Sequence, residues 1–162
     1  MRYASHTSVS VEKSRGEIEW VLKRYGAGSF GYLTKDGIAM IAFEAQNRRI
    51  RMIVPLPDPK DFERNKKGYE RKAERALRSW EQACRQRWRA LALVVKAKLE
   101  CVESGVATFE QEFLPYTLLP DGKTVGDFML PQVALAYQTG EMPPLMIGPP
   151  EKTKAREVSD GE

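Results

Sequence analysis

The residue types that most often carry out chemistry are sparse in this chain. It contains one histidine, His6, and two cysteines, Cys84 and Cys101. Because a zinc site needs three or four such ligands, these residues predict no zinc site. The cysteines lie on one predicted helix, about 25 Å apart along its axis, which is too far for a disulfide. We interpret both as small buried apolar residues of a reducing compartment, and we expect no metal and no cofactor.

Three acidic residues follow an order found in metal-dependent nucleases: one on a first helix, one in a hairpin and one in Glu-x-Lys on the next strand. Glu17, Asp36 and Glu44 occupy these places, but Gln46 replaces the lysine. Asp36 also stands in an Asp-Gly pair, which favours a hairpin turn without any catalytic role. An extended strand would separate Asp36 from Glu44 by about 25 Å, too far for one metal ion. The sequence therefore predicts no catalytic residue, and a nuclease is kept only as a second alternative.

The strongest functional signal is a concentration of positive charge. Residues 60–98 hold 13 of the 26 lysines and arginines but only 5 of the 22 acidic residues. At about 100° per helical residue, six of these cations fall within an arc of about 80°. This cation row consists of Arg71, Arg75, Arg78, Arg85, Arg89 and Lys96. Arginine predominates in the row, and its planar guanidinium suits bidentate contact with phosphate. Arg49 and Arg51 form a second basic element on a predicted strand.

Three interpretations of the cation row stay open. It can be an ordinary solvated helix face, it can bind an acidic protein, or it can bind nucleic acid through phosphates without sequence specificity. Aromatic residues could add base stacking to the last of these. Trp80 and Trp88 lie on the apolar side of the predicted helix, which favours core packing. Phe30 and Tyr32 are the better stacking candidates if the exposed face of the sheet binds a strand.

The elements that must position these residues follow from the sequence pattern. Residues 7–12 alternate like an edge strand, and Ser14 with Glu17 forms a capping box that begins a helix ending at Gly26. Two tight turns then join three predicted strands, at residues 29–35, 38–45 and 48–54. A long helix is predicted from about residue 69 to 104. Because its length of about 50 Å exceeds a three-stranded sheet, we expect downstream segments to cover the remainder, including a short helix at 109–113 and a last helix from 125 to 139.

The composition fits one soluble domain, because 42% of the 162 residues are hydrophobic. We expect residues 1–148 to form a single α+β domain, in which a small antiparallel sheet of three or four strands packs on one long helix with a C-terminal helical cap. Residues 149–162 are predicted to be a disordered polar tail. No apolar run approaches the roughly 20 residues that span a bilayer, so we expect a cytoplasmic protein with no membrane partner. The sequence is also compatible with a homo-oligomer.

Three segments carry a resemblance to known proteins: residues 80–99, 119–126 (LPDGKTVG) and 139–144 (TGEMPP). They resemble small uncharacterised proteins of bacteriophages and prophages, over most of residues 7–147. The resemblance implies a phage context and host cytoplasm, and assigns no activity or residue role. The order of helix, hairpin and long helix is also similar to phage single-strand annealing proteins, by topology alone. We therefore predict a non-catalytic nucleic-acid-binding protein of phage or mobile-element DNA metabolism. The first alternative is an interaction protein that inhibits or modulates an acidic host target.

Overall fold

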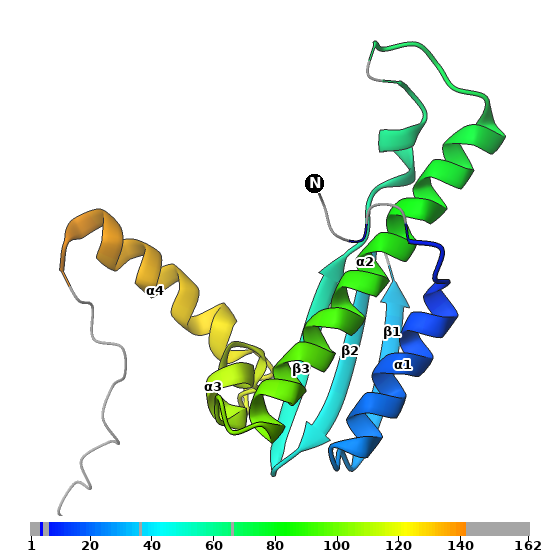
Figure 1. Cartoon of the computed structure of the whole chain (residues 1–162). Coiled ribbons are helices and arrows are strands. Elements are labelled where there is room, and N and C mark those ends of the chain that lie inside the picture. The colour runs from blue at the N-terminus through cyan, green and yellow to red at the C-terminus, as the bar shows by residue number, and fades with distance from the viewer. Residues whose placement is uncertain (1–3, 5–6, 36, 66, 142–162) are drawn as a thin grey trace, which may run out of the picture. The chain divides into compact units, whose positions relative to one another are not determined.

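The computed structural model describes residues 4, 7–35, 37–65 and 67–141. They belong to two compact units, the first ending at Gly126 and the second beginning at Asp127. The first unit combines an antiparallel sheet with one long helix (Figure 1), which confirms the α+β class. His6, Asp36 and the expected tail at 149–162 lie outside the described residues. Within the described part, no helix is both long and apolar enough to cross a membrane.

The sheet is a three-stranded meander in the order β1-β2-β3. Its strands are β1 (Ser29–Lys35), β2 (Ile38–Ala45) and β3 (Arg48–Pro55), which confirms the predicted hairpins. The β2–β3 turn has positive φ at Gln46 and Asn47, as a two-residue type I′ turn requires. Residues 7–12, however, form no fourth strand.

Two helices cover the same face of the sheet (Figure 1): α1 (Val11–Arg24) and α2 (Ala73–Glu103). Alternate residues of β2 point toward them, so that Ile41 is fully buried whereas Met40 is only partly covered. The core between the layers consists of apolar side chains from α1, α2, β2 and β3, among them Ile18, Leu22, Phe43, Ile50, Trp88 and Val95, and Phe30 of β1 packs against it partly buried. Burial of these side chains is the main term that holds the helices on the sheet.

The start of α1 differs from the prediction. The helix begins at Val11, and Ser10 caps it by accepting a hydrogen bond from the Lys13 amide at 3.1 Å. Ser14, the predicted cap, is buried inside the helix and donates its hydroxyl to the Ser10 carbonyl at 3.0 Å. Either serine could cap by its chemistry. Ser14 lies on the same face of the helix as Ile18 and is therefore packed against the core. The helix begins about one turn before Ser14.

The C-terminal end of α2 is covered from downstream, as predicted. Helix α3 (Phe109–Phe113) begins at Thr108, which forms a capping box with Gln111, and a 3-10 turn, η2 (Leu114–Tyr116), follows it. The Phe113 ring stacks on Phe109 at a centroid distance of 4.7 Å and meets Phe43 edge-on at 5.7 Å. These rings close the core between α2 and the sheet.

The N-terminal end of α2 is covered from upstream instead, so the expectation of a downstream cover is wrong there. A 3-10 turn, η1 (Pro59–Phe62), lies against the first turns of α2. The Trp80 indole N–H donates to the Pro57 carbonyl at 2.9 Å. Leu77 stays about half exposed on the same helix, because the sheet does not extend beneath it. Helix α2 therefore projects past the sheet (Figure 1).

The second unit contains most of α4 (Val125–Thr139), which ends at Gly140 with a positive φ. From Phe128 to Thr139 the helix has no charged residue, and Pro131 lies inside it. Several of its large side chains are exposed, including Leu130 and Tyr137. Helices that are apolar on all sides are usually buried against a partner.

Candidate nucleic-acid interface

The structure divides the predicted cation row into parts with different surroundings. Arg71 precedes α2 rather than lying on it, because the helix begins at Ala73. Its backbone N–H donates to the Glu63 carbonyl at 2.7 Å, which fixes its place in the connection between β3 and α2. The other five cations lie on α2 as predicted, but they do not form one uniform solvated face.

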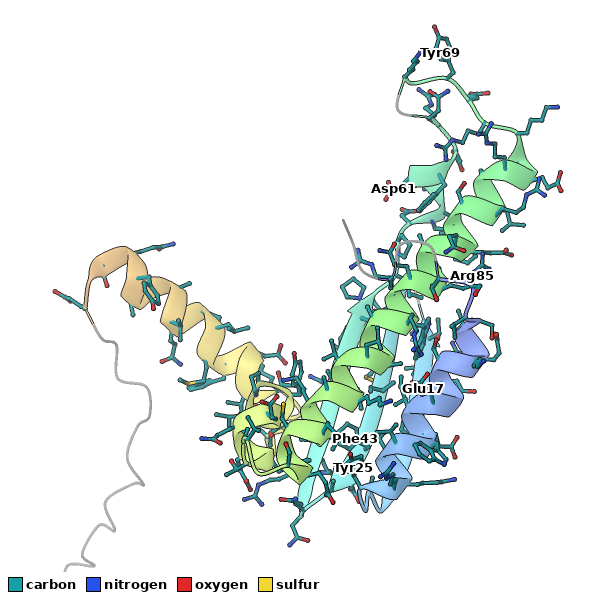
Figure 2. The ribbon with its side chains drawn as sticks, in the orientation of Figure 1. Glu17, Tyr25, Phe43, Asp61, Tyr69 and Arg85 are labelled. Atoms are coloured by element: carbon teal, nitrogen blue, oxygen red, sulfur yellow. The ribbon has the colours of Figure 1, made fainter. Side chains whose placement is uncertain are left out.

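Arg85 and Arg89, in the middle of α2, are committed to contacts within the chain. The Arg89 guanidinium forms an ion pair with the Glu17 carboxylate of α1, with side chains only 23% and 28% exposed. Figure 2 shows Glu17 and Arg85 in the region where α1 and α2 lie side by side. Arg85 donates two hydrogen bonds to Gln82 Oε1, at 3.0 and 2.8 Å, and lies 3.9 Å from Glu81. Phosphate binding here would require these contacts to break.

Contacts of this kind connect α1 and its N-terminal flank to α2 along its length. Each joins a residue near the N-terminus to one more than 70 positions later. Contacts made by later residues of α1 and its flanks are made to later residues of α2. They are Gln82 to the Thr7 carbonyl at 2.9 Å, Arg89 to Glu17, and Tyr25 to Glu100 at 2.8 Å. The two helices therefore run parallel, and the middle of the cation row borders α1.

Beyond the N-terminus of α1 the same row is open to water. Arg75 and Arg78 are both exposed. Arg78 pairs only with Glu74 on its own helix, at 3.3 Å, with side chains 68% and 77% exposed. Such a pair contributes little stability and is readily exchanged for another anion. Lys96, in the C-terminal half of α2, is also exposed and has no acidic partner among the described residues.

The exposed cations of α2 continue into the connection before it, and we call residues 57–78, which the structure describes except at residue 66, the basic arm. Its tip is a turn built on Asn65, whose side-chain oxygen accepts from the backbone N–H groups of Lys67 at 2.8 Å and Tyr69 at 3.1 Å. The Asn65 N–H donates in turn to the Tyr69 carbonyl at 2.8 Å. Gly68 supplies the positive φ that this turn requires. The tip therefore has a defined geometry.

Figure 2 shows Tyr69 at the far end of the arm, where its side chain is 70% exposed. In sequence the arm contains eight cations against five acids. The described cations of the arm are Lys60, Arg64, Lys67, Arg71, Lys72, Arg75 and Arg78. Sequence reasoning missed Tyr69 because it placed this residue at the start of the predicted long helix, whereas α2 begins at Ala73. Asn65 and Gly68, both turn-forming residue types, were the signal that could have identified it.

The second basic element lies on the face of the sheet away from the helices. Arg49 and Arg51 alternate with the buried Ile50 and Met52, so their predicted outward orientation is found. In the pairing register Arg49 stands opposite Glu44, which offsets part of its charge. Leu33, Met40 and Ile53 stand opposite one another and form an apolar row across this face. The outer face is therefore mixed rather than uniformly basic.

The predicted stacking residues do not line this outer face. Phe30 and Tyr32 pair with Phe43 and Ile41, and residues directly opposite in a sheet point to the same side. Both rings consequently lie on the helix side of β1. The Arg15 guanidinium lies over the Tyr32 ring at 4.5 Å and over the Trp88 ring at 4.4 Å. The expectation that Phe30 and Tyr32 serve an exposed sheet surface is therefore wrong.

The tryptophans of α2 differ from each other in burial. Trp88 is 1% exposed and belongs to the core, as predicted. Trp80 is only partly buried, and its indole N–H donates to the Pro57 carbonyl of the connection before α2. Neither ring is free to stack on bases in this arrangement.

Of the three acidic residues considered for catalysis, the two described ones, Glu17 and Glu44, lie on different elements. Glu17 is paired with Arg89, whereas Glu44 is on the outer face of the sheet. Among the described residues, no three His, Cys, Asp or Glu side chains are grouped to hold a metal ion. Burial raises the pKa of the Cys84 thiol, which lowers its thiolate fraction and its reactivity.

No protein-family model, no curated protein and no solved structure matches this chain. The resemblance to phage proteins therefore stays a prediction. Among the described residues, the basic arm brings six exposed cations together in one connection.

Proposed function

We propose that this protein binds nucleic acid without catalysis, through phosphate contacts made by the basic arm. The observation that supports this most is that six of the seven described cations of the arm are exposed and Arg71 is partly exposed, whereas Arg85 and Arg89 are held in contacts within the chain. An exposed guanidinium can replace water and counterions with phosphate oxygens at little structural cost. We place this activity in phage or mobile-element DNA metabolism in a host cytoplasm, following the sequence resemblance.

Tyr69 gives the arm a second mode of contact. Aromatic rings stack on any unpaired base, because every base has a π-face, and each stacked base contributes about 1–3 kcal/mol. Bases inside a duplex are not accessible to such a ring. We therefore propose that the arm prefers single-stranded over double-stranded nucleic acid, and that its affinity is independent of sequence.

The test is fluorescence anisotropy with labelled single-stranded DNA, single-stranded RNA and duplex DNA of equal length over a series of salt concentrations. An arm variant combines Arg71→Glu, Arg75→Glu and Arg78→Glu. A control variant combines Lys13→Glu, Lys23→Glu and Arg24→Glu, three exposed cations of α1. Both variants change the net charge equally.

The arm variant should bind more weakly to every sequence, with the slope of log K against log salt reduced by about three, about one per lost cation. The control variant should retain nearly all affinity. An equal loss in both variants would attribute binding to net charge alone, and absence of binding by the unaltered protein at low salt would refute the proposed function.

A separate variant tests the stacking contact. Tyr69→Ala should weaken single-stranded binding by about 1–3 kcal/mol and leave duplex binding nearly unchanged. Trp20→Ala is the matched control, because Trp20 is 60% exposed but lies on α1 outside the arm. If Tyr69→Ala changes neither affinity while the arm variant still does, the phosphate contact holds and the stacking contact does not.

A second candidate function, binding of an acidic protein, has support from the outer face of the sheet. Leu33, Ile38 and Ile53 are each about half exposed there, near Arg49 and Arg51. An apolar centre with a cationic rim suits an acidic amphipathic partner. In a pull-down with host lysate, capture that survives nuclease treatment and is lost in Ile53→Asp would favour this candidate.

A further inference from the structure

The two edges of the sheet differ in how much of their backbone is paired with other segments. At the β3 edge, the Leu118 N–H donates to the Arg49 carbonyl at 2.8 Å, and Thr117 forms a bridge with Ile50. At the β1 edge, strand residues pair only with β2 within the described part of the chain. One edge is therefore partly covered, while the other presents its outward N–H and C=O groups.

The β1 edge has few of the features that keep edge strands from pairing with other chains. Such features are short length, proline, bulges and charged side chains along the edge. Strand β1 has seven residues in continuous register with β2, no proline, and a single charged residue, Lys35, at its end. All its residues except Phe30 are exposed. A strand of this kind is a template for another strand.

We infer that β1 pairs with β1 of a second copy of this chain, in antiparallel orientation about a two-fold axis. Full overlap of the seven residues places Tyr32 on the axis. Gly31 then lies opposite Leu33, Phe30 opposite Thr34, and Ser29 opposite Lys35 of the other copy. No like charges face each other in this register, so the pairing meets no electrostatic repulsion between opposite residues. The product is one continuous sheet of two meanders.

Side chains on both faces are compatible with this pairing. On the outer face, Leu33 ends the apolar row with Met40 and Ile53, so two such rows would meet across the axis. On the inner face, the Arg15 guanidinium donates to the Thr34 hydroxyl at 3.1 Å and stays over the Tyr32 ring. Neither contact uses a backbone N–H or C=O group of β1.

A second copy suits this edge better than the C-terminal segment of the same chain. Residues 142–150 contain four prolines, and proline has no N–H to donate to a sheet ladder. The segment after them carries five charged side chains within residues 151–158, a pattern that disfavours an added strand.

Sedimentation velocity over a range of protein concentrations tests the inference. The unaltered protein should form a species of about twice the 18.4 kDa chain mass. Leu33→Lys should weaken dimerisation at least about tenfold, because it puts two cations beside the axis. Ile53→Lys is the matched control, since Leu33 and Ile53 share the outer face and are both 51% exposed. The control should dimerise like the unaltered protein.

Hydrogen exchange supplies an independent readout that does not depend on a variant. Protection of β1 backbone amides should rise with protein concentration if a second copy covers the edge. A monomer at all concentrations, or protection of β1 independent of concentration, would overturn the inference. If Ile53→Lys weakens dimerisation as much as Leu33→Lys, the inference would also be overturned. The dimer would then form by packing of the outer sheet faces and not by pairing of β1 edges. The outcome is independent of nucleic-acid binding.

Discussion

The first turns of α2 and its middle carry the same kind of cation on the same side of one helix, yet the two regions differ in what those cations do. Among the described residues, Arg78 is exposed and pairs with a neighbour on its own helix, whereas Arg89 is held against α1 by Glu17. The difference arises because α1 begins at Val11, just after its cap Ser10, which lines the same surface pocket as Arg85, and the helix does not extend to Arg78. Helical periodicity therefore predicts which face of α2 carries the cations. The extent of α1 alongside that face determines which of these cations stay exposed.

The largest expected effect concerns the apolar face of the same two regions. Trp88→Ala should lower the free energy of unfolding by about 3–5 kcal/mol, because it removes a fully buried ring from the core. Leu77→Ala, on the projecting part of the helix, should cost less than about 1 kcal/mol, because Leu77 is half exposed. Urea denaturation measures both. Similar costs would mean that the two regions are equally packed.

The next effect concerns the cations themselves. Arg89→Glu should lower the free energy of unfolding by about 1–3 kcal/mol, because it removes a partly buried pair and places a carboxylate beside Glu17. Arg78→Glu should change it by no more than about 0.5 kcal/mol. The charge-swapped double variant Glu17→Arg/Arg89→Glu should recover part of the loss. Failure to recover any of it would count against the ion pair as the cause.

A smaller effect is expected where the arm is attached to α2. Trp80→Phe removes the indole N–H that donates to the Pro57 carbonyl, and should cost about 1 kcal/mol. Hydrogen exchange should then increase in the arm and not in the sheet. Trp20→Phe, at an exposed position of α1, is the control and should leave arm exchange unchanged.

The smallest effect is a pH dependence at the C-terminal end of α1. Tyr25 donates its hydroxyl to the Glu100 carboxylate, and this hydrogen bond raises the pKa of Tyr25 above its usual value. Since the folded-state pKa is raised, the stabilisation is present below the unfolded pKa, near 10, and is lost as the pH rises through the folded pKa. Absorbance titration at high pH should show a late-ionising tyrosine that Tyr25→Phe removes. If the late titration step is still present in Tyr25→Phe, it belongs to another tyrosine.

The sequence was sufficient where structure depends on neighbouring residues. The three strands were predicted almost to the residue because the two tight turns fix their register. The core face of α2, with Trp88 and Val95, followed from helical periodicity. The predicted short helix at 109–113 also formed.

The sequence was insufficient where distant segments decide the outcome. The pairing of Arg89 with Glu17 depends on two helices meeting 72 positions apart, which no local pattern encodes. The orientation of Tyr32 depends on the register of β1 with β2 rather than on its own residue type. The ordered tip of the arm depends on the Asn65 side chain, whose turn geometry a polar stretch does not reveal.

The parallel arrangement of α1 and α2 also bears on the order in which the chain folds. The meander closes through turns of two residues, whereas the contacts between the helices join residues 72 to 75 positions apart. Closing the longer loops costs more chain entropy before any contact forms. We therefore expect the helix pair to assemble after the meander. Loss of the Arg89–Glu17 pair should then accelerate unfolding and leave the refolding rate nearly unchanged.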